Sequence, residues 1–368
     1  MNKIKLTSLL LIPLVCSSCG INYKTYPITD YRTTMTFHED FKIMQMTDLH
    51  LGIESDLKEQ LSFITNSIKH ANPDLIIFTG DNFMYSTKGI VKEFLKTVND
   101  VCEELTKQNN QLTKFAITYG NHDNQGDYYR YFINKEVKKY VTEDGKEKVD
   151  NKYAAFIDFE DDDLHGLTNY YIDLLNPEDK NDVKYRLHII DSNTYKFNGF
   201  GYDYDVIYTN QAEHARNIYQ NSSDKDYIGL AFFHIPFAQY AEAIEQYKNS
   251  SNPSKVGRME TGEPVSSPTY NNLSYPILRE ANILAYFVGH DHINMGEIIY
   301  NATDASVDNK AIFSYGVKST NQLYHDVNLM GYKLINLKNN MSQEEFLSVN
   351  NIINNITNVT DMEGNYDK

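Results

Sequence analysis

Metal-binding side chains stand just after two short apolar runs in this sequence. Residues 41–46 are followed by Asp48 and His50, two positions apart, and residues 75–79 lead through a glycine to Asp81. Such a run, bounded by polar residues and turn signals, is typical of a buried strand that ends in a loop. Carboxylates and imidazoles at a strand end are ligands that suit divalent transition metals.

Three later runs end in the same way. The polar residues after them are Asn121, His122 and Asp123 after 115–119, His234 after 229–233, and His290 and His292 after 285–288. Converging at one sheet edge, these strand ends would form a polydentate metal site. A carboxylate such as Asp81 has two oxygens and can bridge two ions, while Asn121 offers a neutral oxygen. His290 and His292, two apart in extended backbone, can each face a different metal.

Two divalent ions at such a site would perform hydrolytic chemistry. Ions about 3.5–4 Å apart hold a hydroxide between them and clamp both ends of an in-line displacement. Their four positive charges exceed the two negative charges of Asp48 and Asp81, so the surplus suits a phosphate oxyanion.

The elements that must position these residues follow from the hydrophobic pattern. Apolar residues at helical spacing predict helices over 56–70 and 89–107, between strands 41–47, 75–79 and 114–118. This β-α-β-α-β order with short loops predicts parallel strands with right-handed crossovers. Open α/β sheets place their ligands at the carboxyl ends of such strands.

The rest of the chain predicts further elements of both kinds. Residues 126–165, rich in tyrosine and charge, interrupt the pattern and are interpreted as an insertion near the mouth of the site. Residues 249–271, rich in Ser, Pro, Asn and Gly, predict a long loop. Short strands near 295–300, 311–315 and 331–337 are expected to be antiparallel and to complete a second sheet. Other strands are expected at 169–174, 184–191, 227–233 and 283–288, and other helices at 210–220 and 238–248.

The charge balance disfavours a nucleic-acid-binding module. The chain has 368 residues, a formal net charge of −16 and no basic run, so its field repels polyphosphate backbones. We see no second compact domain, and the sequence leaves the oligomeric state open.

The N-terminus predicts export. Lys3 and Lys5 precede an apolar run over 6–15, then small residues up to Cys19, in the order of a signal peptide. Spanning a bilayer takes about 20 apolar residues, so this run is too short. The segment before Cys19 is similar to a bacterial lipobox, and we favour a lipid anchor on Cys19 at the extracellular face of the cell membrane over an ordinary cleaved signal. Residues 1–19 would then be the signal, 20–40 a tether, and Cys102 a core thiol without a disulfide partner.

Five motifs follow one another over residues 48–292. They are Asp-x-His, Gly-Asp-Asn, Gly-Asn-His-Asp, a lone His and Gly-His-x-His. In this order they resemble the motifs of the calcineurin-like metallophosphoesterase superfamily. The Gly-His-Asp-His form and the segment 234–236 are most similar to its purple-acid-phosphatase-like branch. The resemblance implies an α/β fold, a four-layer α/β/β/α sandwich of two mixed sheets flanked by helices. We assign this domain to 41–338, followed by a tail over 339–368.

The resemblance also implies roles for single residues. One metal would be held by Asp48, His50, Asp81 and His292, and the other by Asp81, Asn121, His234 and His290. His122 would contact the phosphate or protonate the leaving oxygen, and Asp123 would orient His122. Where purple acid phosphatases carry a tyrosine ligand, this chain has Met84 and then Tyr85. A ferric ion is therefore not implied, and Mn, Fe or Zn remain open.

Two functions are compatible with these residues. The first is an exported, membrane-anchored phosphoesterase whose substrate is a phosphate monoester or diester. The second is a non-catalytic metal-binding surface lipoprotein that retains the fold. The complete ligand set together with His122 favours the first.

The other polar and aromatic residues near these motifs are expected to have structural roles. Asn82 is expected to cap its loop. The tyrosines at 85 and 128–131 are more often expected to pack against the protein than to bind substrate. The remaining histidines are expected to be structural or exposed: His38, His70, His165, His188, His214 and His325.

Overall fold

The computed structural model of this chain describes nine ranges of residues. They are 31–52, 57–141, 152–158, 164–270, 273–302, 310–326, 330–342, 345–346 and 356–358. The predicted signal peptide, the anchor Cys19 and the first part of the tether lie outside the described residues, as do 142–151 and 159–163 of the predicted insertion and most of the tail.

The first sheet is built from the predicted β-α-β-α-β unit. Three parallel strands, β2, β3 and β4, alternate with helices α1 and α2. The bounds are β2 (Phe41–Met46), α1 (Leu57–Ala71), β3 (Leu75–Thr79), α2 (Lys88–Asn109) and β4 (Lys114–Thr118). Two more strands extend it on the β2 side, β14 (Gly331–Leu337) and β15 (Ile356–Asn358), both antiparallel to their neighbours. Every residue of β3 and β4 is buried, as expected of parallel strands covered on both faces.

The second sheet is larger and mixed. Among the described residues it has eight strands in the order β1-β5-β6-β9-β11-β13-β12-β10. The bounds are β1 (Arg32–Thr36), β5 (Asn169–Leu175), β6 (Val183–Ile190), β9 (Ile228–Phe232), β10 (Gly257–Thr261), β11 (Ile283–Val288), β12 (Asn294–Asn301) and β13 (Lys310–Tyr315). The helices that follow its strands are α4 (Thr209–Asn221), α5 (Gln239–Lys248) and α6 (Ser274–Leu278).

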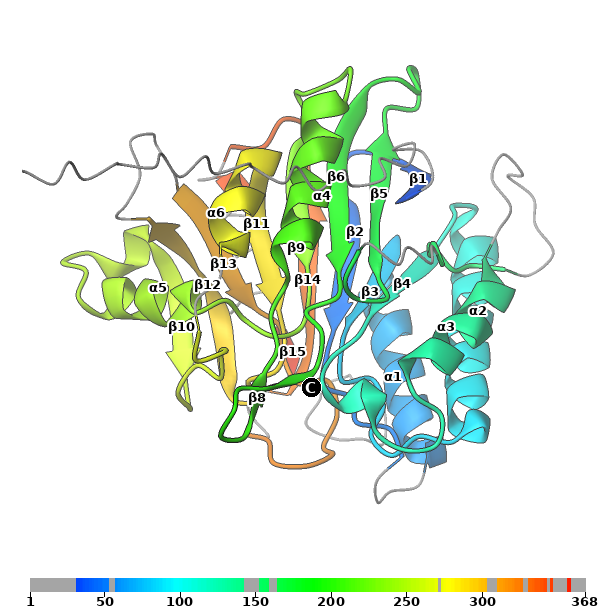
Figure 1. The fold of residues 1–368 in the computed structure, drawn as a ribbon. Coiled ribbons are helices and arrows are strands. Elements are labelled where there is room, and N and C mark those ends of the chain that lie inside the picture. Colours follow the sequence, from blue (N-terminus) through cyan, green and yellow to red (C-terminus); the bar gives the residue numbers. More distant parts are fainter. Residues whose placement is uncertain are drawn as a thin grey trace, which may run out of the picture.

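The two sheets pack face to face with helices on both outer sides, which is the predicted four-layer α/β/β/α sandwich (Figure 1). One apolar core contains residues of both sheets, for example Ile43 and Ile76 with Leu230 and Phe287. A second core lies between the other face of the larger sheet and its helices, for example Tyr240 against Phe313 with ring centroids 4.5 Å apart.

Three expectations about single segments were wrong. Residues 331–337 form β14 in the first sheet, not the second, whereas β12 and β13 pair antiparallel in the second sheet as expected. Residues 257–261, expected in a loop, form β10. The second half of the expected tether forms β1, the edge strand of the larger sheet, with alternating buried side chains. These errors share a cause, because each of the three strands pairs with a partner far away in sequence.

Smaller elements complete the described fold. The predicted insertion contains α3 (Arg130–Val137), which packs against α2, and a two-stranded hairpin, β7 (Tyr195–Phe197) and β8 (Tyr202–Tyr204), was not predicted. No helix within the described ranges combines the length and the apolar character needed to cross a bilayer.

Candidate metal centre

The predicted ligands lie at the carboxyl ends of strands from both sheets. Asp48 and His50 follow β2, Asp81 follows β3, and His290 follows β11. All four have positive φ, with values of 57°, 50°, 48° and 79°. Asp and His are among the few non-glycine residues that tolerate this region, and such strain clusters at functional sites.

Two glycines leave the space that the carboxylates of Asp81 and Asp48 occupy at the site. A Cβ atom on Gly120 would collide with Asp81 Oδ1, and one on Gly289 would lie 2.8 Å from Asp48 Oδ2. Neither collision can be relieved cheaply, because both carboxylates are buried and held by backbone amides. The glycines before Asn121 and His290 are therefore needed for the approach of one strand end to the next.

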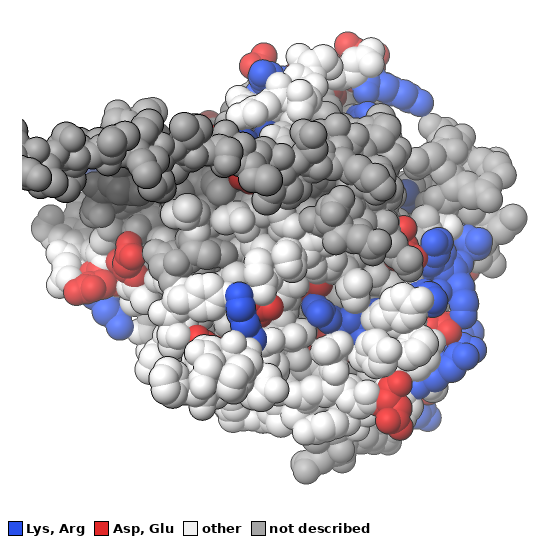
Figure 2. Space-filling model, viewed as in Figure 1, with Lys and Arg blue, Asp and Glu red and all other residues white. Residues whose placement is uncertain are grey.

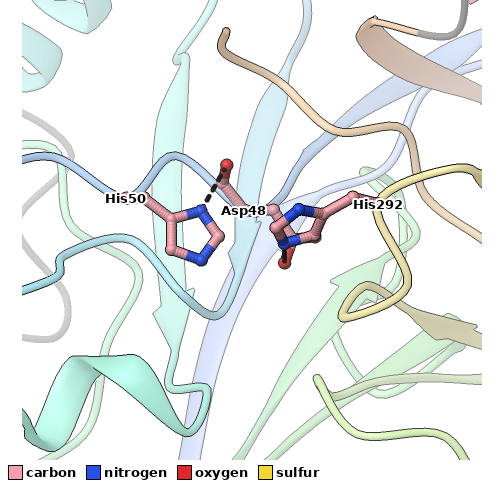
Figure 3. A group of neighbouring side chains, drawn as sticks. All are labelled: Asp48, His50 and His292. Atoms are coloured by element: carbon pink, nitrogen blue, oxygen red, sulfur yellow. Dashed lines mark hydrogen bonds and ion pairs between the residues drawn. The ribbon is translucent and has the colours of Figure 1, made fainter. Parts of the chain in front are cut away.

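The imidazoles converge on these two carboxylates. His234 Nε2 lies 3.1 Å and His50 Nε2 lies 3.3 Å from Asp81 Oδ2. His292 Nε2 lies 3.5 Å from Asp48 Oδ1. Figure 3 shows His50 and His292 on either side of Asp48 at the end of its strand. Side chains separated by more than 200 positions thus meet as the sequence predicted.

The described residues form three overlapping groups able to hold a metal ion, with ligand atoms within 4.8 Å of one another. The groups are Asp48, His50 and His292; Asp81, His234 and His290; and His50, Asp81 and His122. The first two contain the histidines expected for the two separate ions. Asp81 is shared by the second and third groups, as expected of a bridging carboxylate.

Several buried polar atoms at this point have no hydrogen-bond partner. They are Asp48 Oδ1, His50 Nε2, Asn121 Oδ1, His234 Nε2 and His290 Nε2. The Nε2 atoms of His50 and His234 have only ion-pair contacts with Asp81 Oδ2. An unsatisfied buried group costs about 1–3 kcal/mol, so the convergence of these atoms favours a bound ligand. Nitrogen and oxygen atoms of this kind are the ligands of Mn, Fe and Zn, so the residues present fit a pair of such ions.

In four of the proposed ligands, the atom opposite the metal-facing one is held in place by the protein. The Nδ1 atoms of His50, His234 and His292 lie 2.9–3.0 Å from backbone carbonyl oxygens. Asn121 Nδ2 donates to the hydroxyl of Tyr195 at 2.7 Å, which leaves its Oδ1 toward the site. Fixing the far nitrogen selects the tautomer whose Nε2 lone pair is free for a metal.

Electrostatics at the centre reflect two buried carboxylates whose oxygens pair with imidazoles and, within the described ranges, with no lysine or arginine side chain. Burial favours a raised pKa for Asp48 and Asp81, but the facing histidines outweigh it and hold both pKa values well below the ordinary value. Burial disfavours the charged form of His234, yet Asp81 and Asp48 raise the pKa of this imidazole to about 9. Burial, aided by the charge of His234, lowers the pKa of His290 to about 3. In the absence of metal, a proton on His234 therefore balances part of the charge.

His122 differs from the other site histidines. Its backbone N–H donates to Asp81 Oδ1 at 2.7 Å, whereas its Nε2 is 4.0 Å from Asp81 Oδ2. Its side chain is 23% exposed, while those of His50 and His234 are fully buried. His122 therefore lies at the open side of the group, where a substrate can reach it.

The expected role of Asp123 is wrong. Its carboxylate accepts hydrogen bonds from the backbone N–H of Phe83 at 2.7 Å and of Gly120 at 2.8 Å. The Nδ1 atom of His122 lies instead 3.0 Å from Gln125 Oε1. Asp123 thus joins the loops after β3 and β4, together with Asn82, whose Nδ2 donates to a backbone oxygen at 2.9 Å.

The sequence analysis missed several residues around the centre. Lys318, only 2% exposed, donates through Nζ to the backbone oxygen of Asp48 at 2.8 Å. Tyr324 stacks on His292 with ring centroids 4.2 Å apart, and Tyr204 meets His290 edge to face at 4.4 Å. Lys318 could have been found, because it follows an apolar strand as the ligands do. No signal in the sequence pointed to the tyrosines.

The family model of the calcineurin-like phosphoesterases matches residues 41–294, well over half of the chain. The chain belongs to this family. Calcineurin-like phosphoesterases are hydrolases that act on phosphate esters and depend on a dinuclear metal centre, which agrees with the ligand groups described above.

Named relatives of this calcineurin-like phosphoesterase include phosphatases. The chain is 26% identical over 298 residues to Phosphatase DCR2 of Saccharomyces cerevisiae, covering 75% of this chain and 47% of that protein. It is 24% and 26% identical to the Probable inactive purple acid phosphatases 14 and 29 of Arabidopsis thaliana, covering 78% and 73% of this chain and 74% and 71% of theirs. The chain thus spans about half the length of the yeast phosphatase, and the plant relatives support the purple-acid-phosphatase-like branch.

Solved structures to which this chain is similar include a dimetal phosphatase from Danio rerio, with a TM-score of 0.47 and 11% identity over 82% of this chain and 93% of that one. Another is GAP50, the anchor in the inner membrane complex of Plasmodium, with a TM-score of 0.43 and 15% identity over 89% of this chain and 93% of that one.

Proposed function

We propose that this protein hydrolyses phosphate esters at the carboxyl ends of β2, β3, β4, β9 and β11. The observation that carries the proposal is the convergence of buried, unpartnered ligand atoms on Asp48 and Asp81. One ion would be held by Asp48, His50, Asp81 and His292, and the other by Asp81, Asn121, His234 and His290. When bound, the ions supply the attacking hydroxide and offset the charge of the phosphate. The native ions are drawn from Mn, Fe and Zn, and the donors present suit all three.

The side chains divide the remaining work. The backbone N–H of His122 holds Asp81 Oδ1, so Oδ2 faces His50 and His234. The partly exposed imidazole of His122 donates a proton to the leaving oxygen. The contact between its Nδ1 atom and Gln125 Oε1 fixes the orientation of the ring. Proton transfer by a positioned group contributes about 10²–10⁴-fold to a rate. Asp123 acts only by joining the two loops that carry Asp81 and Asn121.

Turnover by the purified full chain tests this function. A chromogenic phosphate monoester and a diester should be assayed with added Mn, Fe or Zn and with a chelator. We expect hydrolysis of one or both esters that the chelator abolishes. A folded chain that hydrolyses neither ester with any metal would contradict the proposal and favour the alternative, a metal-binding protein without catalysis.

The cellular place of this activity is a separate proposal. The charged, apolar and small residues before Cys19 support export and a lipid anchor on that cysteine. The Cys19→Ser variant should move from the membrane fraction to the soluble fraction of expressing cells, with its phosphoesterase activity unchanged. Unchanged partitioning would refute the anchor without affecting the catalytic proposal.

A further inference from the structure

The hairpin formed by β7 and β8 carries a row of aromatic side chains on one face. Tyr195 pairs with Tyr204 and Phe197 pairs with Tyr202. The ring centroids are 5.7 Å apart in the first pair and 5.6 Å apart in the second. Because side chains two apart on a strand lie on the same face, these four rings form one surface, which we call the aromatic face.

The inner end of the aromatic face touches the metal centre. The hydroxyl of Tyr195 accepts a hydrogen bond from Asn121 Nδ2 at 2.7 Å. The ring of Tyr204 meets the ring of His290 edge to face, with centroids 4.4 Å apart. Both partners are proposed metal ligands, so the aromatic face begins at the centre.

The opposite face of the hairpin is fixed to the protein. Lys196 Nζ donates to the hydroxyl of Tyr270 at 3.2 Å. The carboxylate of Asp203 accepts from the backbone N–H of Thr269 at 3.0 Å. These contacts alternate with the aromatic residues along both strands, as a two-residue period requires. The face of the hairpin opposite the aromatic face is therefore anchored to the protein. This anchoring fixes the orientation of the aromatic face before any substrate binds.

The outer pair of the aromatic face is largely exposed. Phe197 is 59% exposed and Tyr202 is 79% exposed, whereas Tyr204 is half-buried. One strand step of two residues places the outer pair about 7 Å beyond the inner pair. In Figure 2 the surface around the position of β8 consists mainly of uncharged side chains. A soluble surface seldom presents paired aromatic rings beside a catalytic centre without a ligand for them.

We propose that Phe197 and Tyr202 determine specificity by stacking against a flat aromatic group on the leaving alcohol of the phosphate ester. This inference rests on the proposed function, since the phosphate must be held at the metal centre for its leaving group to reach the outer pair. Aromatic rings favour stacked or edge-to-face partners over saturated groups of the same size. The uncharged rings add no repulsion toward the phosphate that the centre attracts.

Two esters with the same carbon skeleton, one aromatic and one saturated, provide the test. The metal-loaded full chain should be assayed with 2-naphthylmethyl phosphate and with its fully saturated decahydro analogue, both of which are esters of primary alcohols. Base-aromatic stacking is worth about 1–3 kcal/mol, or roughly 5- to 150-fold. We expect kcat/KM to favour the aromatic ester by about 5- to 30-fold, at the lower end because the outer pair is partly solvated.

Variants of the outer pair should remove this preference. Phe197→Ala and Tyr202→Ala should lower kcat/KM for the aromatic ester several-fold more than for the saturated one. Phe197→Leu and Tyr202→Leu, which keep apolar volume for folding, should show the same loss of preference. Phe200→Ala is the matched control, because Phe200 is fully exposed in the turn beyond the last cross-strand pair, and it should keep the preference.

The outcomes separate this inference from the function beneath it. Equal kcat/KM for both esters in the wild type, or a preference that survives in the Phe197 and Tyr202 variants, would overturn the aromatic specificity while leaving the phosphoesterase intact. Turnover of neither ester by the folded, metal-loaded chain would instead overturn the proposed function.

Discussion

Buried carboxylates occur in two regions of this molecule with opposite surroundings. Asp173, in β5 of the larger sheet, accepts two hydrogen bonds from the guanidinium of Arg186, at 2.7 Å and 2.9 Å. Arg32 adds a third cationic nitrogen at 2.9 Å. Asp81 is equally buried but faces imidazoles and a backbone amide. The first carboxylate has a permanent cation and the second does not.

The difference teaches how to separate a structural charge from a functional one. A guanidinium is always protonated and has no acceptor, so it completes the hydrogen bonding of Asp173. An imidazole exchanges its proton for a metal, so the histidines around Asp81 can receive a cation from outside. Single unpartnered atoms occur elsewhere, such as His188 Nε2, but at the metal centre several of them converge.

Removing the central carboxylate should have the largest effect. Asp81→Ala eliminates the shared ligand, so we expect turnover to fall by more than about 10⁴-fold, as when a residue of a catalytic unit is lost. Metal content should fall below two per chain. Stability of the metal-free protein should also decrease, because the change removes the buried carboxylate that pairs with His50 and His234 and accepts the backbone N–H of His122. Metal analysis measures the metal content, steady-state kinetics measure the turnover, and denaturant titration measures the stability. Unchanged metal content would contradict the proposed ligand set.

Removing His122 should separate catalysis from metal binding. His122→Ala should lower kcat by about 10²–10⁴-fold through loss of the proton donor, while metal content stays at two per chain. The control is His38→Ala, since His38 is exposed and lies near Asp74 at the opposite ends of the strands. Loss of metal in the His122 variant would mean that His122 is a ligand.

Removing the permanent cation should affect stability alone. Arg186→Met leaves Asp173 buried with only the half-exposed Arg32 nearby, so we expect unfolding to become easier by about 3 kcal/mol. Turnover and metal content per folded molecule should not change. Denaturant titration beside the kinetic assay measures both, and a loss of activity in the folded variant would mean that the two regions are coupled.

The same structural region should produce a modest dependence on pH. Burial, together with the charges of Arg186 and His214, lowers the pKa of His188 to about 3 from the ordinary 6.5. The unfolded chain binds a proton below pH 6.5 and the folded chain does not, so stability is complete above pH 6.5 and falls on acidification. The loss at pH 5.5 is about 1.4 kcal/mol.

The matched variant is His188→Gln. In denaturant titrations, its free energy of unfolding should depend less on pH between pH 7 and 5.5 than that of the wild type. An equal dependence in the variant and the wild type would show that His188 is not responsible for the loss of stability.

Residues adjacent along the chain could be predicted well, and partners remote in sequence could not. The unit from β2 to β4 was confirmed within two residues at each end, because each of its elements carries its own periodicity. The convergence of the candidate ligands could be predicted because each of them follows an apolar strand. Asp123 was misassigned because its partners, Phe83 and Gly120, are backbone groups that no pattern reveals. β14 and β10 depend on pairing partners that only the folded chain brings near. The β7–β8 hairpin is local, and it was missed because each of its strands is only three residues long.

Anomalous diffraction from crystals of the manganese-loaded full chain tests the central claim most directly. The account predicts two metal peaks, both in contact with Asp81, one beside His50 and His292 and the other beside His234 and His290. A single peak, or peaks that do not touch Asp81, would contradict it.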